Sequence, residues 1–260
     1  MSDTAVEYHV DLERRDGGQI AWLRFHSTHK MNVMTLDTLA RMVQAVDEVK
    51  QDEDIRVLVV AGKEDVFSGG ADLEMLRDLG DDKYKSYIAT EYELFRKLEE
   101  LPCITVAAIP GPCIGNAAEI ALACDYRVAR ADMRFGYPEL IVGFVAPAQR
   151  LSQYVGIGKA KELLYEGRLI GAEEAERLGL VTKVVDADLF EAVQKEAERY
   201  ARIAPFALPL TKQGIHRCYG MPGRFDALEA SSAFATYKSE DFQEGSSAAL
   251  ERRKPDFKGR

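Results

Sequence analysis

The sequence predicts an α/β fold, with a βα core at residues 1–190 and a helical region at 191–260. Two patterns lead to this prediction. Short apolar runs rich in β-branched residues alternate with segments of helical apolar spacing as far as residue 185. From residue 187 onward the pattern is helical, so the last part of the chain adds little to a sheet. A chain of 260 residues can form one sizeable core with a helical appendage.

The N-terminal part predicts a hairpin, a helix and a buried strand. Residues 7–13 and 19–25 flank an Asp-Gly-Gly sequence, which is typical of two paired strands. Apolar residues recur at helical spacing over 35–50, behind Thr35 as a candidate N-cap. The run IRVLVVA at 55–61 is short and β-branched, as expected for a strand covered on both faces.

The middle of the chain repeats this alternation. A helix is expected at about 83–100 and a buried strand at 103–109, where a Pro-Gly-Pro sequence ends it. Residues 117–124 indicate a short apolar helix around a single charged residue, Glu119. Further strands are expected at 126–129, 133–136 and 181–185, and further helices at 151–166 and 172–179, the last ended by Gly179. Interruptions of the helical region are expected at Pro205, Pro209 and 220–223.

Composition excludes several classes of protein. The formal net charge of −9 argues against a nucleic-acid partner, which requires clustered Lys and Arg, although a small anionic ligand needs only a few local cations. No apolar run is long enough for a membrane helix, and the N-terminus is too polar for a signal peptide, so we expect a cytoplasmic protein. The cysteines lack a CxxC pair or a histidine cluster, which predicts reduced, mostly buried thiols and no metal site: Cys103, Cys113, Cys124 and Cys218.

Two glutamates stand in unusually apolar surroundings. Glu119 lies in IGNAAEIALAC, where an ionised carboxylate is costly to bury alone. A structural salt bridge to an arginine is one interpretation. Glu139 lies in FGYPELIVG, also between apolar residues. If both face one dry cleft, burial and mutual repulsion raise at least one pKa, giving an acid/base pair that can add water to a double bond or move a proton along an acyl chain.

Two loops could supply backbone donors. FSGGADL, at 67–73, follows the strand at 55–61, and its adjacent glycines let the backbone approach a ligand, although a simple turn with Asp72 as a helix cap is the alternative. Asn116 stands at the start of the apolar helix, where the helix dipole favours negative charge. One N–H group from each loop would form an oxyanion hole.

FSGGADL, AIPGPCIGNAAEIALACDYRVA, FGYPELIVG and the terminal SEDFQEGSSAALERRKPDF together resemble the enoyl-CoA hydratase/isomerase, or crotonase, superfamily over nearly the whole chain. The resemblance implies a crotonase-like spiral of ββα units, followed by C-terminal helices that form a trimer or a dimer of trimers. It implies an acyl-CoA thioester as substrate, with coenzyme A as part of the substrate and no separate cofactor.

The resemblance also assigns roles to residues. Gly69 and Asn116 are implied to donate backbone N–H groups to the thioester oxygen, with Glu119 as the base on water and Glu139 as the proton donor to the α-carbon. Within the superfamily, the sequence most resembles a hydratase that adds water across the 2,3-double bond of an enoyl-CoA thioester, or catalyses the reverse dehydration. The residues implied to contact coenzyme A are Lys30, Ala71, Asp72, Leu73, Lys254 and Phe257. For the lysines, a solvated surface position is the alternative.

Two departures from the family pattern affect the acyl pocket. Asn116 replaces a glycine, which adds a side chain while allowing a left-handed backbone. The loop at 143–150 is shorter and poorer in glycine, and Phe144 and Pro147 suggest a short, branched or cyclic enoyl group. The alternatives are a double-bond isomerase or acyl-CoA hydrolase of the same fold, or a homologue without catalytic activity.

Overall fold

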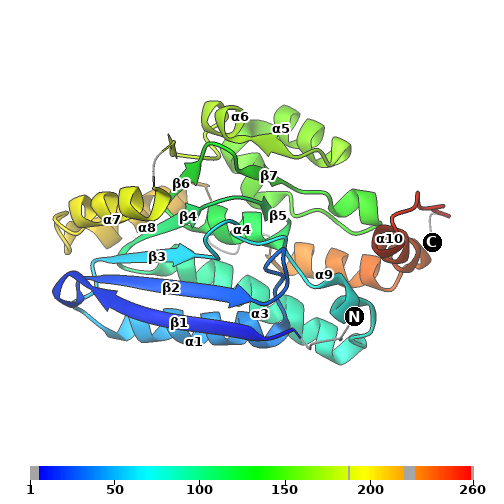
Figure 1. Ribbon diagram of the computed structural model, residues 1–260, viewed down its shortest axis with the longest axis horizontal. Helices are drawn as coiled ribbons and strands as arrows, with labels where there is room; N and C mark the ends of the chain where they lie inside the picture. Colours follow the sequence, from blue (N-terminus) through cyan, green and yellow to red (C-terminus); the bar gives the residue numbers. More distant parts are fainter. Residues whose placement is uncertain (1–5, 187, 220–225, 259–260) are drawn as a thin grey trace.

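The computed structural model describes residues 6–186, 188–219 and 226–258. Within these residues, a six-stranded sheet has the order β1-β2-β3-β4-β6-β9 (Figure 1). The predicted hairpin is confirmed, because β1 (Tyr8–Arg15) and β2 (Ile20–Ser27) pair antiparallel. The other strands continue the sheet in parallel: β3 (Val57–Ala61), β4 (Ile104–Ile109), β6 (Tyr126–Arg130) and β9 (Lys183–Val185).

A second, three-stranded sheet has the order β5-β7-β8. Its members are β5 (Cys113–Ile114), β7 (Arg134–Gly136) and β8 (Ile170–Gly171). The sequence predicted β7 alone, because two-residue strands such as β5 and β8 are too short to show a pattern. β5 matters for the site, since it lies between the Pro-Gly-Pro turn and Asn116.

Helices cover both faces of the six-stranded sheet, as the wholly apolar strands predicted. Leu58 and Val60 pack with α1 (Leu36–Gln51), α3 (Asp81–Glu100) and α4 (Asn116–Ala123). Val57 and Val59 point the opposite way and pack with α7 (Leu189–Tyr200). Thr35 caps α1, because its hydroxyl accepts a hydrogen bond from the Thr38 N–H and the Thr38 hydroxyl accepts one in return.

The remaining helices of the core are α2 (Leu73–Arg77), α5 (Gln149–Glu166) and α6 (Ala172–Arg177). Five-residue α2 begins directly after Asp72, so the alternative interpretation of Asp72 as a helix cap is confirmed, although no bounds were predicted for this helix. Gly179 has φ +76° directly after the C-cap of α6, so this helix ends at a glycine as predicted.

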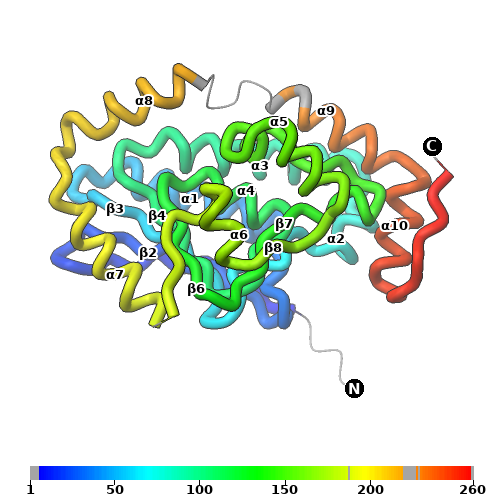
Figure 2. Tube along the Cα trace, turned by 90° about the horizontal axis from the view of Figure 1, so that it is seen from above, coloured from blue at the N-terminus to red at the C-terminus, as the bar shows by residue number. Residues whose placement is uncertain are grey.

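Only helices follow β9 in the part of the chain that the structure describes: α7, α8 (Ala207–Tyr219), α9 (Asp226–Tyr237) and α10 (Glu240–Glu251). α9 and α10 lie at the opposite end of the molecule from α7 (Figure 2). The predicted division at residue 190 falls inside α7, whose Val193 and Ala197 are buried in the core.

The predicted interruptions have mixed outcomes. Pro205 precedes α8, as expected. Pro209 lies in the first turn of α8, so the predicted interruption at this residue was wrong. A proline in the first turn removes no intrahelical hydrogen bond, because the N–H groups of that turn have no partner within the helix. The expected interruption at 220–223 lies outside the described residues.

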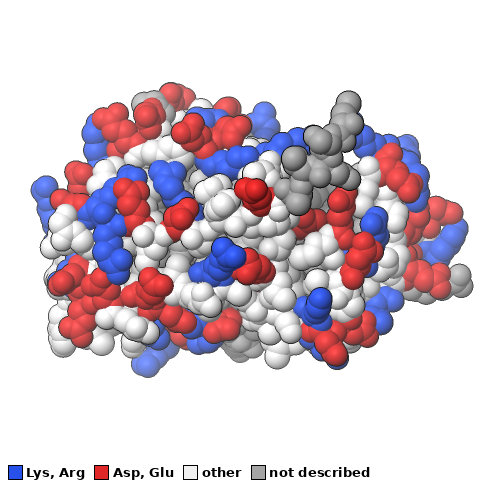
Figure 3. Space-filling view, turned by 60° about the horizontal axis from the view of Figure 1, so that its bottom comes forward, with Lys and Arg blue, Asp and Glu red and all other residues white. Residues whose placement is uncertain are grey.

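The cysteines and surface charges agree with ordinary globular packing. Three of the four cysteines are buried, whereas Cys218 is exposed. Among the described residues, no group of three or more His, Cys, Asp or Glu side chains could hold a metal ion, and no helix is long and apolar enough to span a membrane. On the face seen in Figure 3, Lys and Arg are interspersed with Asp and Glu.

Candidate active site

A cavity of about 730 Å³ lies between the core and the C-terminal helices. Its walls come from the loop after β3, from α3, from the start of α4, from the segment between β7 and α5, and from α9 and α10. Glu119 and Glu139 both line it, as do Ala71 and Asn116. The structure therefore brings together residues that the sequence singled out in separate segments.

The two candidate donor loops run side by side. The Ser68 N–H donates to the Pro112 carbonyl, and the Ile114 N–H donates to the Ser68 carbonyl, each at 3.0 Å. Gly70 has φ +95°, and a Cβ added there would lie 2.8 Å from the Ile114 carbonyl oxygen. Only glycine therefore permits this close approach, which sets the loop beside the N-terminus of α4.

Gly69 is not an available donor, which corrects the residue expected from this loop. Its N–H already donates to the Met31 carbonyl at 2.7 Å, and the Gly70 N–H donates to the Ser68 hydroxyl at 3.0 Å. For the N–H groups of Ala71 and Asn116, in contrast, the described residues provide no hydrogen-bond acceptor. Both residues line the cavity, one from each loop.

Glu119 lies in the first turn of α4 and is 1% exposed. Its carboxylate accepts a hydrogen bond from the Tyr137 hydroxyl at 2.9 Å and one from the Arg150 guanidinium at 3.3 Å. Burial raises the pKa of Glu119 to about 7, and Arg150 opposes that rise by favouring the charged form. The structural ion pair that was one interpretation of Glu119 is therefore present, at the edge of the cavity.

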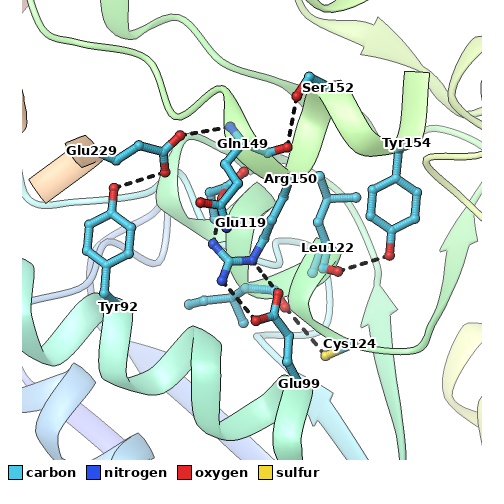
Figure 4. Close-up of polar contacts among 12 residues, drawn as sticks. Tyr92, Glu99, Glu119, Leu122, Cys124, Gln149, Arg150, Ser152, Tyr154 and Glu229 are labelled. Carbon is cyan, nitrogen blue, oxygen red and sulfur yellow. Dashed lines mark hydrogen bonds and ion pairs between the residues drawn. The ribbon is translucent and has the colours of Figure 1, made fainter. Parts of the chain in front are cut away.

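Arg150 bridges two buried carboxylates, as Figure 4 shows. Its guanidinium donates to Glu99 from two nitrogens, at 2.6 and 3.1 Å, and contacts Glu119 with a third. All three side chains are at most 2% exposed. The sequence did not reveal this triad.

Glu139 has a different environment. It begins a single 3₁₀ turn, η2 (Glu139–Val142), and its buried Oε2 atom has no hydrogen-bond partner among the described residues. Gly115, at φ +63°, allows the approach, because a Cβ there would lie 3.0 Å from Glu139 Oε1. Burial raises the pKa of Glu139 to about 8, with a further contribution from the charge of Glu119.

A third carboxyl group with a raised pKa lines the cavity, and the sequence analysis missed it. Glu91 is 8% exposed on α3, and burial raises its pKa to about 7. It follows Tyr87 and precedes Phe95 at helical spacing, on the face of α3 that carries the apolar residues. That spacing was the signal that could have identified it.

The residues implied to contact coenzyme A divide into two groups. Ala71, Asp72 and Leu73 line the cavity, and Asp72 also caps α2 by accepting from the Met75 N–H at 3.0 Å. Lys30, Lys254 and Phe257 are exposed and lie outside the cavity wall. Contact of this second group with a ligand stays a prediction.

The loop at 143–148 is held by the C-terminal helices. The Glu229 carboxylate, on α9, accepts from the N–H groups of Ala148 and Gln149 at 3.0 and 2.8 Å, and from the Tyr92 hydroxyl at 3.2 Å (Figure 4). Glu229 therefore satisfies N–H groups at the start of α5 that have no partner within the helix. Phe144 and Pro147, which were expected to shape the acyl pocket, line the cavity.

Comparisons with known proteins agree with this architecture. The family model described as enoyl-CoA hydratase/isomerase matches residues 15–260. A short-chain-enoyl-CoA hydratase of Clostridium acetobutylicum is 33% identical, with 96% of this chain and 98% of the relative covered. A crotonyl-CoA hydratase of Syntrophomonas wolfei is also 33% identical, at 95% and 97% coverage.

Solved structures give the same result for the fold. The crystal structure of an enoyl-CoA hydratase/isomerase from Xanthobacter autotrophicus Py2 is similar with a TM-score of 0.85 and 27% identity, covering 93% of each chain. The predicted crotonase-like α/β fold with a helical C-terminal region is thereby confirmed. By the extent of the family match and the identity to its relatives, the chain belongs to the enoyl-CoA hydratase/isomerase family.

Proposed function

We propose that the protein is a hydratase that adds water across the 2,3-double bond of an enoyl-CoA thioester, or catalyses the reverse dehydration. One observation carries the proposal: Glu119 and Glu139 line the same cavity in unlike environments. The names of the relatives from C. acetobutylicum and S. wolfei support the same class of reaction. Coenzyme A is then part of the substrate, and the proposal includes no separate cofactor.

The surroundings of the two glutamates suit opposite roles. Tyr137 and Arg150 donate to Glu119 and stabilise its ionised form, so Glu119 is the general base. Glu139 has no side-chain donor among the described residues, and burial outweighs the effect of its own backbone N–H, so it keeps its proton near neutral pH and serves as the acid. Glu119 removes a proton from the water molecule while the water oxygen forms a bond to C3. Glu139 delivers a proton to C2. The sum is the addition of one water molecule.

Negative charge develops on the thioester oxygen as water attacks, so donors to that oxygen lower the barrier. The N–H groups of Ala71 and Asn116 are the donors in this proposal. Three features support them: their lack of a protein acceptor, their place in the cavity wall and the contact between their loops. Asn116 is also the first residue of α4, where the helix dipole favours negative charge.

Steady-state hydration of crotonyl-CoA by the wild type, Glu119→Gln and Glu139→Gln tests the proposal. Each substitution should lower kcat/KM by about 100- to 10,000-fold, the usual contribution of a general acid or base. Glu48→Gln, an exposed position on α1, is the matched control. Near-wild-type rates in both active-site variants would refute the mechanism.

Analysis of the products separates the rival reactions. A hydratase yields the 3-hydroxyacyl-CoA, an isomerase interconverts 2-enoyl-CoA and 3-enoyl-CoA, and a hydrolase releases free coenzyme A. If no acyl-CoA is converted, the protein is a homologue without catalytic activity.

The assembly belongs to the same proposal: a homotrimer, or a dimer of trimers. Apolar side chains at and just before α8 support it, because Phe206, Leu210 and Ile215 are 84%, 57% and 55% exposed. A mass measured by light scattering would contradict it if it corresponded to a monomer or to a simple dimer.

A further inference from the structure

Polar groups from α3 and α4 meet in one part of the cavity wall. The Asn116 amide donates to the Tyr87 hydroxyl at 2.7 Å, so its side chain links the two helices, and the same amide favours the ionised form of the nearby Glu91 carboxyl group. Tyr87, Glu91 and Asn116 all line the cavity. Apolar residues surround them on α3, including Ile88 and Phe95. The side chains of this polar cluster, Tyr87, Glu91 and Asn116, have no role in hydration as proposed above, which uses only the backbone N–H of Asn116.

The polar cluster has hydrogen-bonding capacity left over. Tyr87 accepts from Asn116, and the described residues give its own O–H no acceptor. The Glu91 carboxyl group has about four acceptor positions when ionised, and the nearby Asn116 amide favours that form. The buried Asn116 Oδ1 atom has no partner in the described part of the chain. Buried polar groups of this kind favour a ligand that both donates and accepts.

The charge of the wall restricts the ligand further. Among the described residues that line the cavity, none is Lys or Arg, whereas four carboxyl residues accompany the two catalytic glutamates: Asp72, Glu74, Glu91 and Glu229. A carboxylate on the ligand would enter without a cation to pair with, close to carboxyl groups, which is unfavourable in a poorly solvated site. A hydroxyl group is neutral and satisfies both a donor and an acceptor.

The position of Asn116 places this ligand group on the acyl chain. In the proposed function, on which this step rests, the Asn116 N–H binds the thioester oxygen. The side chain of the same residue then lies beside the acyl part of the substrate rather than beside the nucleotide.

We infer that Tyr87, Glu91 and Asn116 form a subsite for a hydroxyl group on the acyl chain, and that the cavity discriminates against acyl groups with a terminal carboxylate. The physiological substrate class is then a hydroxylated enoyl-CoA, or the corresponding dihydroxyacyl-CoA in the reverse direction. Phe144 and, on α3, Ile88 and Phe95 supply the apolar walls around the polar subsite.

A matched set of substrates tests this inference. The set is hex-2-enoyl-CoA, its derivatives with a hydroxyl group at C4, C5 or C6, and the derivative with a terminal carboxylate. At least one hydroxylated substrate should exceed hex-2-enoyl-CoA in kcat/KM by about tenfold or more, as expected for a hydrogen bond to a buried carboxyl group. The terminal carboxylate should be the poorest substrate of the set.

Variants connect the preference to the subsite. Tyr87→Phe and Glu91→Leu should remove most of the preference for the hydroxyl group, and Glu91→Gln should improve the relative use of the terminal carboxylate. Tyr84→Phe should keep the preference, because the Tyr84 hydroxyl donates to the Ala233 carbonyl. Glu93→Gln should also keep it, because Glu93 pairs with Lys97 on the same helix. Tyr87→Phe and Glu91→Gln preserve shape, so they serve if Glu91→Leu does not fold.

Binding separates this inference from the proposed function. Calorimetry with the saturated acyl-CoA and its hydroxylated analogues measures the affinity of the subsite for the hydroxyl group, because these ligands bind without reacting. Tighter binding of a hydroxylated analogue to the wild type, lost in Tyr87→Phe, supports the subsite. It does so even if no enoyl-CoA is hydrated, because the absence of hydration would reject only the proposed hydratase activity. Hydration of all substrates without a preference for any hydroxyl group, together with equal binding of the analogues, overturns the subsite and leaves the hydratase intact.

Discussion

Glu119 and Glu139 face the same cavity, but the protein surrounds them differently. Glu119 lies in a helix, where Tyr137 and Arg150 donate to its carboxylate. Glu139 lies in a single 3₁₀ turn, and its buried Oε2 atom has no partner among the described residues. Both pKa values are raised by burial, to about 7 and about 8 respectively. The difference lies in the support that each negative charge receives.

Two residues of the same type can thereby divide the roles of base and acid. Charge on Glu119 is stabilised by a buried guanidinium, whereas charge on Glu139 is opposed by burial and by Glu119. The charge of Glu119 also raises the pKa of Glu139, so near neutral pH a proton resides mainly on Glu139. Removing the support of Glu119 and removing the charge of Glu139 should therefore have opposite effects on stability near pH 8.

The largest effect is expected from Arg150→Met. The substitution leaves Glu99 and Glu119 buried without the guanidinium that lies between them, so the free energy of unfolding should fall by about 3–5 kcal/mol. Urea denaturation at pH 8 measures it. Arg41→Met is the matched control, because Arg41 forms an exposed pair with Asp37 and its loss should cost about 0.5 kcal/mol or less. A loss below about 1 kcal/mol for Arg150→Met would show that the charge of Glu119 does not depend on Arg150.

A smaller effect of opposite sign is expected from Glu139→Gln. The folded state raises the pKa of Glu139 from 4.5 to about 8, so the folded protein binds this proton more tightly. The stability that the protonated group contributes is therefore present below about pH 4.5 and is lost as the pH rises toward 8. Glutamine stays neutral throughout, so the variant should become more stable than the wild type, by about 1–3 kcal/mol, as the pH rises from 5 to 8.

Urea denaturation at several pH values, with Glu119→Gln as the comparison, measures this difference. Glu119→Gln removes a partner of Arg150 and should show a smaller gain or a loss at pH 8. If the two variants show the same dependence on pH, the two glutamates have equivalent environments and the division of roles is wrong.

The sequence predicted the long elements of the fold well and the short ones poorly. α1, β3 and β4 carry clear periodic or continuous apolar patterns, and each was placed within about two residues. β5 and β8 contain two residues each, and α2 contains five, so no period could be detected in them. Their conformations depend on pairing with distant strands and on the cap at Asp72 rather than on local pattern.

The site was predictable where a residue contrasts with its neighbours in sequence. Glu119 and Glu139 stand in apolar runs, but Glu91 has charged neighbours on α3 and differs from them only in the face that it occupies. Arg150 could not be assigned, because its partners Glu99 and Glu119 are 51 and 31 residues away. Nor could the sequence show that the Met31 carbonyl accepts the hydrogen bond of the Gly69 N–H, which leaves the Ala71 N–H as the available donor.

The smallest effect is expected from Tyr137→Phe. The Tyr137 hydroxyl donates to Glu119 and favours its charged form, so removing it raises the pKa of Glu119 further above its ordinary value. Less of the base is then ionised at pH 6, and kcat/KM for crotonyl-CoA should fall about two- to tenfold there, the value of one hydrogen bond. At pH 8 the loss should be smaller, because a larger fraction of Glu119 is ionised in both proteins.

Tyr154→Phe is the control for this measurement, because the Tyr154 hydroxyl donates to the Leu122 carbonyl and contacts neither catalytic glutamate in the described structure. A pH–rate profile of both variants separates the possibilities. An equal loss at pH 6 and pH 8 would mean that Tyr137 positions the Glu119 side chain without changing its protonation. A loss that grows as the pH falls would mean that the hydroxyl stabilises the charge of the base, the feature that distinguishes Glu119 from Glu139.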